Sequence, residues 1–179
     1  MDDNNTSLRI DKLLRHMLCV PRQMTNVHEV YSAHEFLIHH VADKHCFNVS
    51  KAAYFIDNPD FDIVCGMAGF HQNESYSGNN HWNEPEDFMR HMGICSFNKA
   101  VKNITLPSIA RNKKDVVDFV KDISDELSIE SPLYISVPVK HQNNGLLIFE
   151  TNNIQEHRQL EEYIVAGAHF FSLCPVFKS

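Results

Sequence analysis

The segment PLYISVPVKHQNNGLLIFE, residues 132–150, decides the fold. Its two apolar runs, 133–140 and 146–151, are rich in β-forming residues and flank the polar sequence HQNNG. Two such runs separated by a few turn-forming residues indicate a β-hairpin. Asn144-Gly145 is the strongest turn signal, because a tight hairpin turn needs residues that tolerate positive φ. The sequence therefore predicts two adjacent antiparallel strands that reverse at Asn144-Gly145.

A second hairpin is predicted upstream of this segment. Residues 52–56 and 61–70 are short apolar runs, and the turn-forming sequence Asp57-Asn58-Pro59-Asp60 separates them. A weak strand is expected around Pro107, where the chain is apolar again. Together these runs predict an antiparallel sheet of about five strands.

Apolar residues at helical spacing predict four longer helices and one short helix. The longer ones cover residues 8–18, 27–45, 112–127 and 155–173, and the short one runs from Pro85 to about Met92. Pro21 is expected to end the first helix, and Asn26 followed by Glu29 is typical of a capping box that begins the second. Gly167, in the middle of the last apolar stripe, is expected to let a neighbouring helix approach closely. The element order predicts an α+β sandwich with helices gathered over one face of the sheet.

Composition narrows the possible classes of protein. A chain of 179 residues with 43% hydrophobic side chains suits one globular domain preceded by a helix over residues 1–26. The net charge of −7 without any basic run argues against a nucleic-acid partner. No run is long and apolar enough to span a membrane, and the polar residues 1–7 do not resemble a signal peptide, so we expect a soluble cytoplasmic protein. Five scattered cysteines without a CxxC pair are expected to be reduced thiols.

The order of elements over about residues 27–173 resembles the GAF family of small-molecule sensor domains. Val137-Pro138, Gly145, the run 147–149 and the closing amphipathic stretch 160–171 stand where that family has a Val-Pro strand end, a turn glycine, an apolar strand and a last helix. The resemblance implies a GAF-like domain over 27–179, with long helices on one face of the sheet. On the other face it implies a roof of loop and short helix, residues 72–98, above a ligand cavity.

The same resemblance implies the residues that would contact a ligand. Apolar walls are expected from Phe70, Trp82, Phe88 and Phe97, polar contacts from Arg90, His91 and Arg111, and a further roof residue is Cys95. The alternative is that Trp82 and Phe88 only anchor a long loop to the core, since large aromatic residues are usually packing residues.

The spacing of histidines and cysteines bears on three further kinds of site: a metal site, a haem site and a reactive thiol. The histidines of residues 27–45 are not spaced three or four apart, which excludes chelation within that helix, and His34 is expected to be a core residue. His91 or His71 beside Met92 and Cys95 leaves a haem ligand open. Gly93-Ile94-Cys95 is similar to the reactive stretch of free methionine sulfoxide reductases, but residues 125–132 lack the second cysteine that those enzymes carry.

These observations predict a non-catalytic sensor domain that binds a small ligand and signals through a shift in conformational populations. The sequence leaves the cofactor unknown: haem, an organic molecule and an empty pocket are all open. A homodimer through the outward faces of the first and last helices is expected from the resemblance. The alternative is a protein-interaction module whose interior is filled by its own side chains.

Overall fold

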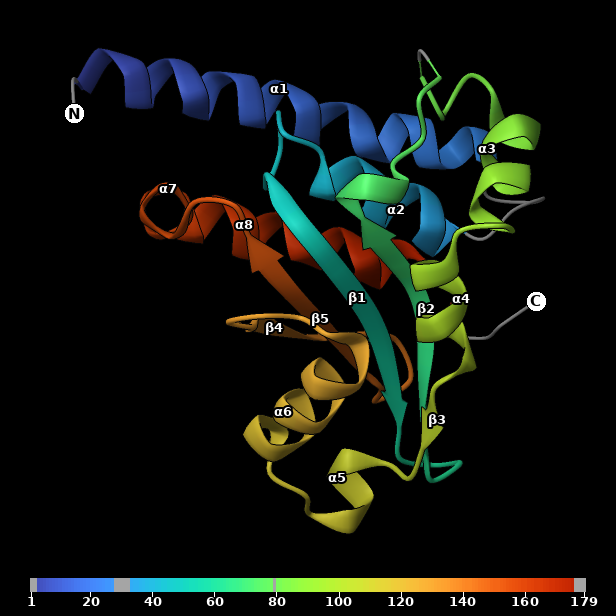
Figure 1. Cartoon of the computed structure of the whole chain (residues 1–179). Coiled ribbons are helices and arrows are strands. Elements are labelled where there is room, and N and C mark those ends of the chain that lie inside the picture. Colours follow the sequence, from blue (N-terminus) through green and yellow to red (C-terminus); the bar gives the residue numbers. More distant parts are fainter. Residues whose placement is uncertain (1–2, 28–32, 79, 176–179) are drawn as a thin grey trace.

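The computed structural model describes residues 3–27, 33–78 and 80–175. Its centre is a five-stranded antiparallel sheet with the strand order β3-β2-β1-β5-β4 (Figure 1). The predicted α+β class and the number of strands are confirmed. Helices pack on both faces of this sheet.

The first hairpin lies where the sequence predicts it. Strand β1 covers Val49–Asn58 and pairs antiparallel with β2, Ile63–His71. The short strand β3, Thr105–Leu106, pairs with the outer side of β2 just before Pro107. Strand β1 therefore lies in the middle of the sheet, between β2 and β5, and most of its side chains are buried.

The second hairpin has a different turn from the one predicted. Strands β4, Leu133–Pro138, and β5, Asn144–Thr151, are antiparallel, but Asn144 and Gly145 already pair within them. The reversal lies earlier, where His141 and Gln142 both adopt φ of 59°. Gly145 is needed for a different reason, because a Cβ atom there would lie 2.3 Å from the Tyr54 hydroxyl.

Helix α1, Asp3–Val27, does not end at Pro21. A proline inside a helix costs about 3 kcal/mol and removes one hydrogen bond. The apolar stripe nevertheless continues past it, since Val20 and Met24 are buried in the same core as Leu13. Packing of this stripe outweighs the local penalty.

Helix α2, Ala33–Ala42, is shorter than the predicted helix over residues 27–45. Residues 28–32 lie outside the described part of the chain, and with them Glu29 of the predicted capping box. Asn26 belongs to the end of α1. All ten residues of α2 are buried, because α1 covers one side and the sheet the other.

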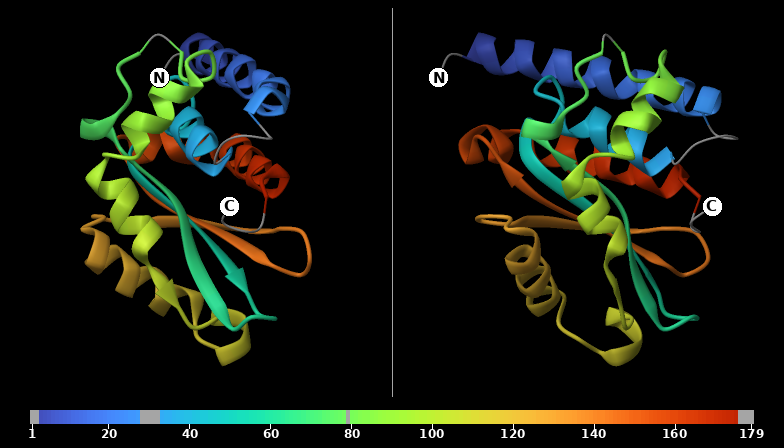
Figure 2. Two further views of the ribbon diagram at one scale, coloured as in Figure 1. Left: turned by 90° about the vertical axis from the view of Figure 1, so that its right-hand side faces the viewer. Right: turned by 45° about the vertical axis from the view of Figure 1, so that its right-hand side comes forward.

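Two helix layers enclose the sheet, so the prediction of helices over one face only is wrong (Figure 2). One layer holds α1, α2, α8 (Glu161–Ala168) and the 3-10 helix η2 (His169–Leu173). The other holds α4 (Ser96–Asn103), α5 (Ile109–Asn112) and α6 (Val116–Leu127). Sequence periodicity predicted helices at the positions of α1, α2, α6 and α8, but it missed α4 and α5 and did not indicate which face each helix covers.

The chain between β2 and β3 also differs from the predicted roof. It forms the 3-10 helix η1, Gln72–Glu74, and the predicted short helix α3, Pro85–Met92. Trp82 and Phe88 are buried in the same apolar cluster as α1 and α2. The segment therefore packs on the face of the long helices, and α4 to α6 cover the face on which a roof was expected.

The predicted last helix is divided at Leu160 into α7, Ile154–Gln159, and α8. Gly167 does permit a close approach, since a Cβ atom there would lie 2.6 Å from the Phe47 ring. That ring belongs to the connection between α2 and β1, and the Met17 side chain of α1 is the next neighbour.

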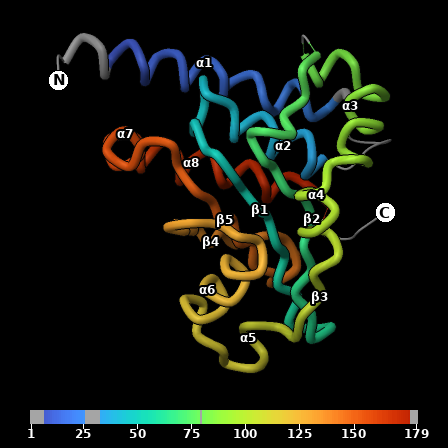
Figure 3. The backbone as a smooth tube through the Cα atoms, viewed as in Figure 1, coloured from blue at the N-terminus to red at the C-terminus, as the bar shows by residue number. Residues whose placement is uncertain are grey.

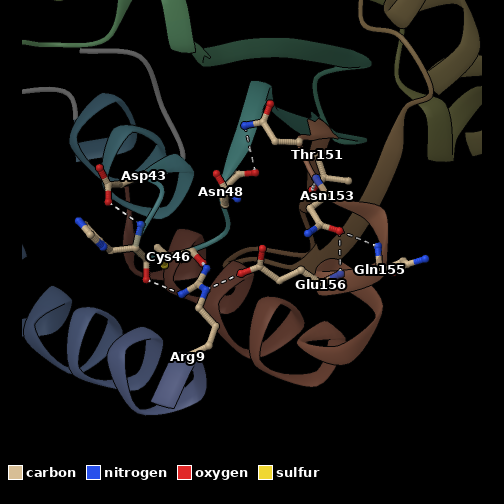
Figure 4. Close-up of polar contacts among 10 residues, drawn as sticks. Arg9, Asp43, Cys46, Asn48, Thr151, Asn153, Gln155 and Glu156 are labelled. Carbon is tan, nitrogen blue, oxygen red and sulfur yellow. Dashed lines mark hydrogen bonds and ion pairs between the residues drawn. The ribbon is translucent and has the colours of Figure 1, made fainter. Parts of the chain in front are cut away.

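Arg9 links α1 by hydrogen bonds to α7 and to the connection between α2 and β1 (Figure 4). Its guanidinium donates to the Glu156 carboxylate on α7 and to the carbonyls of His45 and Cys46. The side chain of Arg9 is only 20% exposed, so its hydrogen bonds compete little with water.

We expect Arg9→Ala to lower the free energy of unfolding by about 2 kcal/mol, because a charged group with three hydrogen bonds, two of them partly buried, is lost. Arg15→Ala is the matched control: Arg15 pairs with Asp11 on the same helix, its side chain is 77% exposed, and its loss should cost below about 0.5 kcal/mol. Urea unfolding of both variants measures the difference. Equal losses would contradict the role assigned to Arg9.

Candidate functional site

Five histidines converge on one pocket of about 350 Å³. Three segments form it: the middle of α1, the end of α2 with the turn after it, and residues 76–78 and 80–82, which pass beside α1 (Figure 3). The lining residues are His16, Cys19, Gln23, His39, His40, Asp43, His45, Tyr76, Gly78, Asn80, His81 and Trp82. Seven of these twelve residues carry aromatic rings, five of them imidazoles, so the lining is rich in nitrogen.

Hydrogen bonds fix the ring of His40. The indole N–H of Trp82 donates to His40 Nδ1 over 3.1 Å, so that nitrogen carries no proton. His40 Nε2 in turn donates to the His16 carbonyl over 3.0 Å. The ring of His16 stacks on His40 with ring centroids 5.0 Å apart. One chain of contacts therefore joins the 76–82 segment, α2 and α1 across the pocket.

His39 and His81 are held in a similar way. His39 Nε2 accepts the backbone N–H of Tyr76 over 2.9 Å. The His81 ring lies against the Phe36 backbone, and its Nε2 atom is buried without a hydrogen-bond partner. This nitrogen is a hydrogen-bond acceptor in the tautomer that carries its proton on Nδ1.

Four histidines of the pocket, His16, His39, His40 and His81, favour the neutral form because they are partly or largely buried. Burial lowers the pKa of His39 and of His40 to about 4, and the pKa of His81 to about 3. Burial also lowers the pKa of His16. Charged imidazolium would lose its hydration here without gaining a carboxylate at close range, since His16 Nε2 lies 4.0 Å from Asp43.

The pocket is not arranged as a metal centre. Cys19 Sγ lies 3.9 Å from His40 Nε2, but that nitrogen already donates to a carbonyl. Burial raises the pKa of the Cys19 thiol, which opposes the thiolate form that metals bind. Among the described residues, no group of three or more His, Cys, Asp or Glu could hold a metal ion.

Three of the eight residues predicted from the sequence lie at or beside this pocket. Trp82 lines it, and the Phe88 ring packs against the ring of His81 with centroids 5.0 Å apart. Phe70 packs edge-on against His39 and lines a smaller neighbouring pocket of about 210 Å³. Phe88 is fully buried, so it supports the pocket wall from behind.

The other five predicted residues lie elsewhere. His91 and Cys95 hydrogen-bond to the Glu74 carbonyl, and Arg90 pairs with Asp87 on the surface of α3. Phe97 packs against the core on the opposite face of the sheet, and Arg111 is exposed on α5 there. The structure therefore divides the predicted set between the two faces of the sheet.

Cys95 lacks the environment of a reactive thiol. Its side chain is buried, and its Sγ atom donates to the His91 carbonyl over 3.3 Å. Burial raises the pKa of this thiol, and the nearby carboxylates of Glu74 and Glu35 raise it further. A nucleophilic cysteine requires the opposite shift.

Sequence reasoning missed the histidines of the pocket. They come from positions 16, 39, 40, 45 and 81, a spacing without any motif, and only the fold brings them together. The available signal was the count of 12 histidines in 179 residues. A high count indicates such a site but cannot locate it.

Comparison with known proteins gives no family for this chain: no family model, no curated protein and no solved structure matches it. The resemblance to GAF domains stays a prediction. Within the described ranges, no helix combines the length and the apolar character needed to cross a membrane.

Proposed function

We propose that the protein is a small-ligand-binding sensor domain, and that its ligand enters the histidine-lined pocket between α1, α2 and residues 76–82. The observation that carries the proposal is the buried, unpartnered Nε2 atom of His81 beside a pocket of about 350 Å³. A buried acceptor without a partner costs about 1–3 kcal/mol. A ligand with a hydrogen-bond donor would remove that cost.

The walls favour a flat ligand. The rings of His16, His40 and Trp82 belong to the lining, and the volume lies at the small end of the range of roughly 300–1,000 Å³ for organic ligands. Asp43, at the turn after α2, is the acidic residue of the lining. A planar nitrogen heterocycle with a ring N–H meets both requirements.

Signalling would follow from the three segments that share the pocket. A ligand that touches α1, α2 and residues 76–82 together binds most tightly to the arrangement in which all three are in contact. It therefore shifts the population toward that arrangement, and a coupling of about 1–3 kcal/mol is typical of such sensors. The proposal includes a homodimer as the assembly that transmits the shift.

Benzimidazole is a suitable probe, with 1-methylbenzimidazole as the matched ligand that lacks the ring N–H. Trp82 is the one tryptophan of the chain, so its fluorescence reports directly on the pocket. We expect saturable quenching by benzimidazole, and a dissociation constant about tenfold higher for the methylated compound, which corresponds to one lost hydrogen bond.

His81→Phe keeps a ring of similar shape and removes the acceptor, so it should abolish the difference between the two compounds. His71→Phe, outside this pocket, is the control and should leave both affinities unchanged. Absence of saturable binding by wild-type protein would refute the site. Equal discrimination in His81→Phe would refute the role of His81.

A further inference from the structure

Strand β4 forms the outer edge of the sheet. Along the described parts of the chain it pairs with β5 alone. Val139, just beyond it, donates its backbone N–H inward to the Asn143 carbonyl over 2.9 Å. Backbone groups of an antiparallel strand alternate between the two sides, so residues 133, 135 and 137 also bond inward to β5. Residues 134, 136 and 138 therefore direct their backbone groups outward.

The outward edge carries only two donors. Pro138 has no N–H, which leaves those of Tyr134 and Ser136, together with the carbonyls of the same residues. The strand, LYISVP, contains no charged side chain. Edge strands that avoid pairing usually carry charge or are covered. Within the strand itself, Pro138 is the only residue of the kind that discourages pairing at an edge.

One face of β4 is also bare. Tyr134 and Ser136 pair with Ile148 and Leu146 of β5, which are buried beneath α6. The Tyr134 side chain itself is 42% exposed, and Ser136 is exposed. Helix α6 therefore covers this face of β5 but not the same face of β4.

A groove of about 640 Å³ lies beside this face, between α6 and residues 128–134. Its apolar lining comes from Val117, Val120, Ile129, Pro132 and Tyr134. Val117 is 56% exposed. The free backbone edge and the groove meet at Tyr134, so they form one continuous surface.

The two outward N–H groups of one β4 strand can each donate to an outward carbonyl of β4 in a second copy of the chain. When two β4 strands lie antiparallel with Ile135 opposite Ile135, each Tyr134 faces a Ser136 of the other strand. Both N–H groups of each strand then donate to carbonyls of the other strand, which gives four reciprocal hydrogen bonds about a two-fold axis. We propose that β4 and the adjacent groove form the homodimer surface of this protein, through which two sheets join into one.

The exposed apolar residues of α1 fit a dimer less well. Leu14 and Leu18 are exposed there, but Asp11 and Arg15 share the same side of the helix and form an ion pair in water. This surface is hydrated as it stands, and its backbone groups are bonded within the helix. The edge of β4 has outward backbone groups that pair with no other strand among the described residues, and a second strand could bond to all of them at once.

Sedimentation velocity over a concentration series tests the surface. It rests on the homodimer of the proposed function, but the ligand site is measured separately. Wild-type protein should sediment as a dimer that dissociates on dilution. Ser136→Pro removes an outward N–H and should raise the dissociation constant of the dimer at least tenfold. Ser136→Ala keeps that N–H and should behave as wild type.

Two further variants decide between surfaces. Tyr134→Lys places a charge at the exposed edge and should give monomers even if Ser136→Pro does not fold. Leu18→Glu alters the α1 surface and should remain dimeric. A monomeric wild type at all concentrations would refute the dimer. Dimers of Tyr134→Lys, or monomers of Leu18→Glu, would refute this surface. Benzimidazole binding should persist in the monomeric variants, which separates failure of the dimer from failure of the ligand site.

Discussion

The protein should lose several kcal/mol of stability when the pH is lowered from 7 to 5. Burial holds the pKa of His34, His39 and His40 at about 4 and that of His81 at about 3, against 6.5 for the model side chain. In the unfolded chain these imidazoles take up protons below pH 6.5, whereas in the folded chain they stay neutral. Proton binding therefore stabilises the unfolded state relative to the folded state as the pH falls.

The direction and range follow from these values. Above pH 6.5 the four groups are neutral in both states and contribute no pH dependence. Between pH 6.5 and about 4 the free energy of unfolding falls, and each histidine contributes roughly 2 kcal/mol at pH 5. The sum is comparable with the whole stability of an ordinary domain, about 5–15 kcal/mol. Urea unfolding followed by Trp82 fluorescence from pH 5 to 8 measures the slope.

His34→Phe is a control for this effect. His34 is 3% exposed, its Nε2 atom lacks a partner, and its ring lies against Tyr54. A phenyl ring satisfies the same packing without titrating, so the variant should be as stable as wild type at pH 7.5 and about 2 kcal/mol more stable than wild type at pH 5. A flat pH profile for the wild type would show that these histidines are not buried as described.

Gly66→Ala should be the most damaging small substitution in the sheet. A Cβ atom at Gly66 would lie 1.9 Å from the carbonyl oxygen of Val101. That oxygen belongs to the backbone of α4, which packs on β2, so the clash cannot be relieved by turning a side chain. We expect a loss of about 3 kcal/mol as α4 is pushed from the sheet.

Gly93→Ala is the matched control, because the nearest atoms to its Cβ would be two carbonyl oxygens at 3.4 Å and its φ is −64°. An alanine there is compatible with the backbone and should be neutral or stabilising by about 0.5–1 kcal/mol. The two urea midpoints should therefore move in opposite directions or differ strongly. Equal effects would contradict the close contact between β2 and α4.

Local patterns in the sequence carry enough information for the sheet. Both hairpins combine strand-forming runs with polar turn residues, and these signals act over a few residues. The position of the second turn could not be read in the same way, because Asn143, Asn144 and Gly145 offer more than one reversal. The choice depends on Tyr54, which leaves no room for a side chain at position 145 and comes from the distant strand β1.

The helices show the same division between local and distant causes. Pro21 is a strong local signal for a helix end, yet α1 continues because Val20 and Met24 are buried on both sides of it in sequence. The face that each helix covers is set by packing that no periodicity reveals. The pocket depends on both effects, since it needs α1 to continue to Gln23 and residues 76–82 to lie beside it.

Pro21 has one more consequence for this pocket. Because residue 21 has no N–H, the carbonyl of Met17 lacks its intrahelical donor, and α1 is weakest where that bond is missing. His16 and Cys19, which line the pocket, precede Pro21 in the helix, and Gln23, which also lines it, follows Pro21. A ligand bound there would contact α1 on both sides of Pro21 and would restrict bending at this point. The angle between the two parts of the helix would then depend on whether the ligand is bound.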